Sequence, residues 1–287
     1  MLALFARGGR NAEVREGIVG LYEDYVKRWG EQLRWSAEAE TERYRKFDER
    51  AAEYPRRALG RDVGGEERKV MWVAYGGDHR HEANGWKFKG SLQDRFAAAH
   101  RLDFASATWP VGPAAPTPEE LVALALDWAR RLPVRYGYAG YSLGVSEEHK
   151  QLTAKTVYDL AMRFQGLEIH DPLCTALCCE TQLKSVNWLT LVSNEMLTPR
   201  YTGPLIGHVG GMDVLRANLS PEIVLHPIRD GVLIQAGPEP LLGDVNRGET
   251  LPLYREVAKV LKPIRAETHW PFFGILTAND WMTRFDR

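Results

Sequence analysis

The residues that come nearest to a catalytic motif are Gly140-Tyr-Ser-Leu-Gly144, which match the pattern G-x-S-x-G. In a serine hydrolase this pattern holds the serine on a sharp turn between a strand and a helix, where its hydroxyl acts as a nucleophile. The glycines at 76–77 would supply an oxyanion loop, and Asp244 and His269 follow in the Ser…Asp…His order of such enzymes. Ser142, Asp244 and His269 therefore form a candidate triad.

Features of the flanking sequence argue against this triad. A nucleophile elbow needs a helix that starts at the serine, so that the first amide groups of the helix face the reacting oxygen. Here Ser146 is the expected N-cap of the next helix, and residues 136–141 are expected to run as one strand through the motif. The segment 262–268 before His269 is typical of a helix end. A hydrolase that uses Ser142 is kept as an alternative.

Two clusters contain residues that bind metals in other proteins. Residues 78–82 read Asp-His-Arg-His-Glu, and on a strand both histidines would lie on one face and could hold a metal ion. We expect a polar surface loop there, because no third, distant ligand is identifiable. His170 and the cysteines at 174, 178 and 179 lack the second ligand pair of ordinary zinc sites. We therefore expect free thiols, with no metal and no cofactor.

The composition excludes several classes of protein. With 37 Lys and Arg and 38 Asp and Glu among 287 residues, the formal net charge of −1 gives no global basic field for nucleic-acid binding. No apolar stretch approaches the roughly 18 residues of a membrane span. The apolar start at residues 1–5 is too short for a secretion signal, and three cysteines fit a reducing compartment. We expect a cytoplasmic protein that contacts neither nucleic acid nor membrane.

Apolar residues at helical spacing predict several amphipathic helices. Residues 13–29 carry apolar side chains three and four positions apart, and residues 41–57 and 251–261 show the same pattern. Thr117-Pro-Glu-Glu120 has the sequence of a capping box with proline at the first helical position, so a helix is expected to begin there. A further helix is expected after the cap at Ser146.

Short apolar and aromatic runs between glycine-rich loops predict the strands. The expected strands are residues 1–5, 69–75, 101–109, 136–144, 185–192, 222–227, 232–236 and 274–277. Arg229-Asp-Gly231 is typical of a hairpin turn. The predicted fold class is α+β, with a mixed, largely antiparallel sheet and packed helices. We expect one domain over residues 1–287, built from two related sub-halves, 1–166 and 167–287.

Four ordered motifs in the second half of the chain resemble a known family. They are Lys184-Ser-Val-Asn-Trp-Leu-Thr190, Asp230-Gly-Val-Leu-Ile-Gln-Ala-Gly-Pro238, Leu242-Gly-Asp-Val-Asn-Arg247, and Leu251-Pro-Leu-Tyr-Arg255 running on to Leu261-Lys-Pro-Ile-Arg265. Leu33-Arg-Trp35 is also similar, and a looser similarity spans most of the chain. On these residues the sequence resembles the type VI immunity family. Members often carry more sequence before the first helix, so the first strand is expected to be incomplete here.

The resemblance implies an immunity protein of the bacterial type VI secretion system, which binds a cognate toxin in the producing cell and blocks it. The toxins of this family include DNases that act in the cytoplasm, so the implied partner is a nuclease. The family pattern carries no catalytic residues, and we interpret its motif residues as structural. Asn187 and Trp188 are expected on a strand, residues 237–238 in a turn, and Asp244 and Arg247 as a local pair.

We expect inhibition by occlusion of the active site of the toxin. A nuclease presents a basic groove, which carboxylates around an aromatic anchor would complement. The candidate toxin-binding residues are Asp78 and Glu82 in the glycine-rich loop, with Trp86 as the anchor. The alternatives to an immunity protein are the Ser142 hydrolase and a non-catalytic scaffold or interaction domain. The sequence defines neither the toxin nor the oligomeric state.

Overall fold

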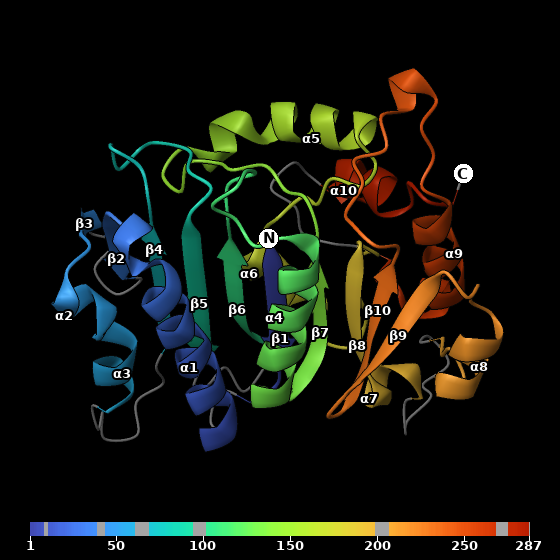
Figure 1. The fold of residues 1–287 in the computed structure, drawn as a ribbon, viewed down its shortest axis with the longest axis horizontal. Helices are drawn as coiled ribbons and strands as arrows, with labels where there is room; N and C mark the ends of the chain where they lie inside the picture. Colours follow the sequence, from blue (N-terminus) through green and yellow to red (C-terminus); the bar gives the residue numbers. More distant parts are fainter. Residues whose placement is uncertain are drawn as a thin grey trace.

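A single sheet of ten strands forms the centre of the protein (Figure 1). The structure is a computed structural model that describes residues 1–8, 11–38, 44–60, 69–93, 102–198, 207–267 and 275–286. The strand order is β3-β2-β4-β5-β6-β1-β7-β8-β10-β9, and every neighbouring pair is antiparallel. With helices packed on this sheet, the α+β fold class is confirmed. The division into two sub-halves stays a prediction.

The strands are β1 (Leu2–Ala6), β2 (Trp35–Glu38), β3 (Tyr44–Lys46), β4 (Lys69–Tyr75), β5 (Lys87–Gln93), β6 (Asp103–Thr108), β7 (Val134–Ala139), β8 (Leu189–Ser193), β9 (Ile223–Ile228) and β10 (Gly231–Ala236). The apolar start of the chain is confirmed as a strand. It lies inside the sheet between β6 and β7, and all of its residues are buried. A strand that is covered on both faces has no place for polar side chains, which explains its uninterrupted apolar sequence.

The helices are α1 (Ala12–Trp29), α2 (Glu49–Ala52), α3 (Tyr54–Leu59), α4 (Pro118–Arg131), α5 (Ala154–Arg163), α6 (Pro172–Cys178), α7 (Asn194–Leu197), α8 (Met212–Ala217), α9 (Pro252–Leu261) and α10 (Ile275–Met282). Short 3-10 helices are η1 (Gly30–Gln32), η2 (Lys150–Thr153), η3 (Val245–Arg247) and η4 (Lys262–Ile264). In Figure 1, α1 and α4 lie side by side in front of the sheet, and α5 crosses beyond one end of the strands. No helix in the described ranges is long and apolar enough to cross a membrane.

Local signals predicted several elements correctly. The helix from Glu13 to Trp29 is α1, which buries one face and ends before Gly30. The capping box is confirmed, because the Thr117 hydroxyl accepts from the Glu120 amide while the Glu120 carboxylate accepts from the Thr117 amide. The hairpin at residues 229–231 joins β9 and β10.

Other predicted elements are wrong or shorter. Residues 44–46 of the helix predicted at 41–57 form strand β3, because they pair with β2, and only short helices follow. Residues 275–277 begin helix α10 and not a strand, while 274 lies outside the described residues. The strand predicted at 136–144 ends at Ala139. Strands β2 and β5 were not predicted.

The core of the sheet is largely aromatic. Phe5 of β1 stacks on Tyr136 of β7, with ring centroids 5.8 Å apart, and also contacts Phe104 and Tyr138. A smaller apolar cluster, which includes Val157 of α5 and residues of α10, lies under α5. This second cluster holds α5 across the end of the sheet, next to the loops described below.

Candidate protein-binding surface

Three loops meet at one end of the sheet and form a continuous surface. They are the β4–β5 loop (residues 76–86), the β6–α4 loop (109–117) and the segment after β7 (140–153). A Cβ atom on Gly85 would lie 2.6 Å from the backbone of Pro110, so the first two loops are in close contact. Gly144 lies against the backbone of Asn84 and joins the third loop to the first. We call these residues the three-loop surface.

The β4–β5 loop is a structured turn with exposed side chains. An oxygen of the Glu82 carboxylate accepts the backbone N–H of Asp78 at 2.7 Å. Gly77 has φ +104°, a conformation that favours glycine. The Tyr75 hydroxyl donates to the backbone carbonyl of Arg80 at 2.9 Å and fixes the far side of the turn. Asp78 and Glu82 are both exposed, as predicted, although Glu82 uses part of its carboxylate to hold the loop.

Trp86 is the last residue of the same loop, directly before β5, and its side chain is half-buried. Its ring packs beside the ring of Trp29, with centroids 6.5 Å apart, and its backbone N–H donates to the Asn84 side chain at 2.8 Å. The indole therefore supports the loop from the side of the core. Its use as an anchor for a toxin stays a prediction.

A buried ion-pair cluster fixes the third loop on the sheet. The carboxylate of Glu147 contacts Lys87 Nζ at 2.9 Å and Lys89 Nζ at 3.0 Å, and these side chains are only 11–13% exposed. Burial alone would raise the pKa of Glu147, but the ammonium groups of Lys89 and Lys87 outweigh it and hold this pKa well below its ordinary value. Lys87 Nζ also donates to the Val145 carbonyl at 3.0 Å. The segment is therefore held in place by charge.

The ion-pair cluster of Glu147 places the next two residues, 148 and 149, against the β4–β5 loop. His81 Nδ1 pairs with the Glu148 carboxylate, and the imidazoles of His81 and His149 stack with centroids 5.3 Å apart. No spacing along the chain indicates this contact, because Glu148 and His149 are far from residues 78–82 in the sequence. The sequence alone identified no distant metal ligand for the histidine-rich loop, but the folded chain brings Glu148 and His149 next to His81.

Two apolar side chains of the three-loop surface are strongly exposed. Val111 in the second loop is 84% exposed and Leu152 of η2 is 83% exposed, the highest values among the large apolar residues that the structure describes. The backbone N–H of Leu152 donates to the carbonyl of His149 at 3.0 Å, so this leucine adjoins the histidine pair. Isolated apolar residues are common on protein surfaces, so exposure alone does not assign these two to an interface. No sequence signal distinguished these residues from core residues.

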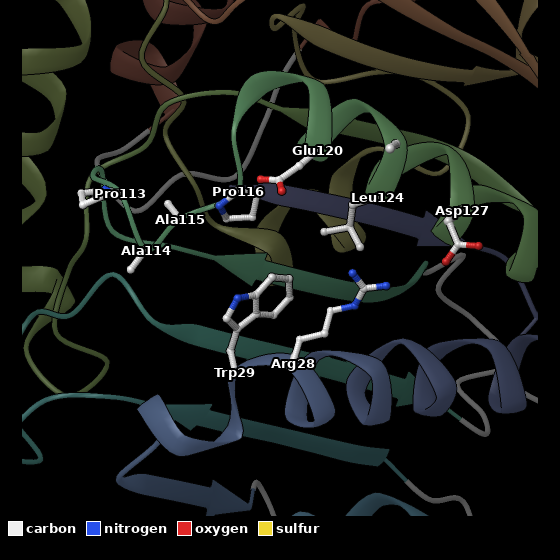
Figure 2. Close-up of a pocket in the computed structure, with 10 residues that line it drawn as sticks. Arg28, Trp29, Pro113, Ala114, Ala115, Pro116, Glu120, Leu124 and Asp127 are labelled. Carbon is white, nitrogen blue, oxygen red and sulfur yellow. The ribbon is translucent and has the colours of Figure 1, made fainter.

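A cavity of about 520 Å³ adjoins the surface on the α1 and α4 side. Figure 2 shows the Trp29 indole and the Arg28 guanidinium of α1 facing Leu124 and Asp127 of α4 across it. Residues 113–116 of the second loop close one end, so the cavity shares a wall with the three-loop surface. Its lining combines apolar side chains with the charged groups of Arg28, Glu120 and Asp127, a mixture that also occurs where protein surfaces meet.

The G-x-S-x-G motif does not form a nucleophile elbow. The first helical turn after β7 begins at Lys150, and Ser146 caps only a turn by accepting the His149 N–H at 3.3 Å, so it is not the N-cap of that helix. A Cβ atom on Gly140 would lie 1.9 Å from the Asn187 side-chain oxygen, which explains glycine at that position structurally.

The proposed partners of Ser142 do not complete a triad in the described residues. The Asp244 carboxylate is held by the Arg163 guanidinium through two hydrogen bonds of 2.9 and 2.7 Å. The expected pair of Asp244 with Arg247 is confirmed at 3.8 Å. These contacts lower the pKa of Asp244, chiefly through the hydrogen bonds from Arg163. His269 lies outside the described residues.

The family-like motif residues make a buried polar network. Asn187 donates to the Glu168 carboxylate at 2.9 Å, and the Trp188 indole donates to the Gly237 carbonyl at 2.8 Å. Contrary to expectation, Asn187 and Trp188 precede β8 and do not lie on a strand, because their polar groups bind side chains and turns. The turn at residues 237–238 is confirmed, with Gly237 at φ +100°.

The cluster of His170 and cysteines lies at α6. His170 Nε2 is 2.7 Å from the Ser106 hydroxyl, and burial, together with the charge of Lys184, lowers the pKa of His170 well below its ordinary value. Cys179 is buried, and none of the three cysteines is in a disulfide. Cys174, Cys178 and His170 are only partly buried, and the cluster lies in and next to α6 and not in the three loops.

Comparison with known proteins gives a family match and a similar solved structure. The model of a family described as "Type VI immunity for VRR-NUC" (TsiV) matches residues 17–285. Among solved structures, the chain is similar to the Pseudomonas aeruginosa T6SS protein PA0821, with a TM-score of 0.81 and 23% sequence identity. The match covers 99% of this chain and 80% of that chain, and at this identity it shows a common fold. A search of curated proteins gives no match.

Proposed function

The chain belongs to the family of type VI immunity proteins for VRR-NUC, and from this we propose that it binds and neutralises a cognate nuclease effector. The family match over residues 17–285 is the observation that carries the proposal. The protein would act in the cytoplasm of the producing cell, where it covers the working surface of the nuclease. It would break no bond itself, and Ser142 would have no catalytic role.

The three-loop surface is the face that we assign to the nuclease. Its tip carries the exposed carboxylates of Asp78, Glu82 and Glu148, which match the basic groove that a nuclease needs for its substrate. Val111 and Leu152 lie on the same three-loop surface and supply apolar area that becomes buried on binding. Because the carboxylates are local, a net charge of −1 does not oppose the proposal.

The fixed geometry of the loops supports this assignment. A rigid surface loses little conformational entropy on binding, so more of the contact energy appears as affinity. The Glu147 ion pairs and the Glu82 turn hold two of the loops before any partner arrives. The cavity beside Trp29 offers a place for a side chain of the nuclease next to the same surface.

The experiment that tests this function is co-expression with the toxin encoded beside its gene, followed by co-purification. We expect a stable complex and normal growth of cells that produce both proteins. V111D and L152D each bury a carboxylate in the proposed interface, and we expect at least about tenfold weaker binding from either.

A matched control is V224D, which makes the same change at a valine that is 45% exposed on the edge strand β9. We expect V224D to bind as the unmodified protein does. Loss of binding in V224D, with normal binding in V111D and L152D, would place the interface elsewhere. Persistent toxicity without a complex would contradict the immunity function itself.

A further inference from the structure

We propose that the tip of the three-loop surface is a zinc site, with His81, Glu148 and His149 as its protein ligands. One potential ligand atom from each of these side chains lies within 4.8 Å of the others. The ligands come from two different loops, so a bound ion would join the β4–β5 loop to the segment after β7. The site shares Glu148 with the surface that we assign to the nuclease, but zinc binding is measured on the protein alone.

The backbone at each ligand is already fixed. Next to His81, the Arg80 carbonyl accepts from the Tyr75 hydroxyl at 2.9 Å. Next to Glu148, the carboxylate of Glu147 is held by two buried lysines. The N–H of His149 donates to the buried Ser146 hydroxyl at 3.3 Å. A metal ion would therefore need to order only three side chains, which lowers the entropic cost of its binding.

The ligand types favour zinc among the common divalent ions. Two imidazole nitrogens and one carboxylate oxygen are the ligands of open zinc sites, whereas calcium and magnesium prefer oxygen alone. A fourth tetrahedral position would remain for water, because the cluster lies at the exposed tip.

Among the contacts that the structure describes at this cluster, Arg80 is the cationic side chain that opposes a metal ion. Its Nε donates to His81 Nε2 at 3.1 Å and lies 3.9 Å from the Glu148 carboxylate. When His81 Nδ1 binds a metal, its Nε2 carries the proton and no longer accepts from Arg80. The guanidinium, which is 49% exposed, must then turn toward solvent. Removal of Arg80 should consequently strengthen zinc binding, the opposite of what removal of a ligand does.

The test is a calorimetric titration of untagged, chelator-treated protein with zinc chloride. We expect one saturable site per chain. H81A, H149A and E148Q should each weaken zinc binding by about tenfold or more, since even a lost partner of a ligand has such an effect. R80A should bind zinc more tightly. H79A is the matched control, because His79 is exposed in the same loop but lies outside the cluster.

Circular dichroism of each variant separates loss of a ligand from loss of folding, since all of these side chains are exposed at the surface. The proposal is overturned if the folded protein binds no zinc saturably. It is also overturned if H81A and H149A bind zinc as the unmodified protein does, or if H79A is the variant that loses it. None of these outcomes depends on whether a nuclease binds, so failure of this site leaves the immunity function in place.

Discussion

The ammonium group of Lys184 forms an ion pair with the carboxylate of Glu168, and these side chains are only 2% and 1% exposed. The Asn187 amide donates to the second carboxylate oxygen, and Lys184 Nζ also donates to the Ile169 carbonyl at 2.9 Å. A buried ion pair is tolerated only when further hydrogen bonds satisfy its remaining polar atoms. Lys184 and Asn187 of the first family-like motif are therefore required for this network.

We predict that K184M strongly destabilises the protein. The substitution keeps much of the side-chain volume but leaves the Glu168 carboxylate buried without a counter-charge, which costs about 3–5 kcal/mol of unfolding free energy. Urea denaturation followed by circular dichroism measures the change. The double variant K184M/E168Q removes both charges and should recover part of the loss. A K184M protein as stable as the unmodified one would show that the pair is not needed.

The Glu147 cluster predicts a loss of stability in acid. Burial opposes ionisation of Glu147, but Lys89 and Lys87 hold its folded pKa below the ordinary value of 4.5. Because the folded pKa is the lower one, the stabilisation is complete above the unfolded pKa and is lost as the pH falls toward the folded pKa. We expect E147Q to cost about 3 kcal/mol at neutral pH.

Denaturation at a series of pH values checks whether the stabilisation by Glu147 is lost as the pH falls. The difference in stability between the unmodified protein and E147Q should be constant from pH 7 down to about pH 5 and shrink below it. K27M removes an exposed lysine of α1 and serves as the control. If the unmodified protein and E147Q differ in unfolding free energy by the same amount at about pH 3 and pH 7, then the lysines do not act on the Glu147 carboxylate.

Gly140 is predicted to be a structural residue. In G140A the new Cβ would meet the Asn187 side-chain oxygen at 1.9 Å, so Asn187 must leave Glu168 or the backbone must shift. We expect a loss of about 1–3 kcal/mol of stability, measured by thermal and urea denaturation. G20A is a suitable control, since no atom lies within 4 Å of a Cβ there. Equal stability of G140A and G20A would contradict the close contact.

Ser142 is predicted to be dispensable. It is only partly buried, so S142A should change stability by about 0.5 kcal/mol or less. Protection of cells that carry the toxin should be unchanged, because the proposed function depends on binding alone. A growth assay with the toxin and either form of the protein measures this. Loss of protection by a stable S142A protein would support the hydrolase alternative.

The sequence predicted elements that carry their own local signal. The capping box at Thr117, strand β4 and the hairpin before Gly231 were all identified from short-range patterns. Strand β5 was missed because it carries Lys87 and Lys89, whose burial depends on Glu147 from a distant segment. Charged residues in a run argue against a buried strand until their partner is known.

The candidate surface was only partly predictable for the same reason. The loop with Asp78 and Glu82 was identified by its glycines and polar residues, and its exposure is confirmed. The approach of His149 to His81 depends on how the third loop is attached to β5, which no spacing along the chain reveals. Leu152 is likewise exposed because η2 lies beyond the end of the sheet, a position that its neighbours in the sequence do not indicate.

Inhibition of the purified nuclease is the most direct test of the central claim. The nuclease encoded beside this gene is incubated with DNA and increasing amounts of the purified protein, and cleavage is followed on a gel. We predict that cleavage stops at about one equivalent of the protein, as expected for tight binding. The S142A variant should inhibit equally well, and V111D and L152D should require a large excess. Unchanged DNA cleavage in the presence of excess folded protein would contradict the account.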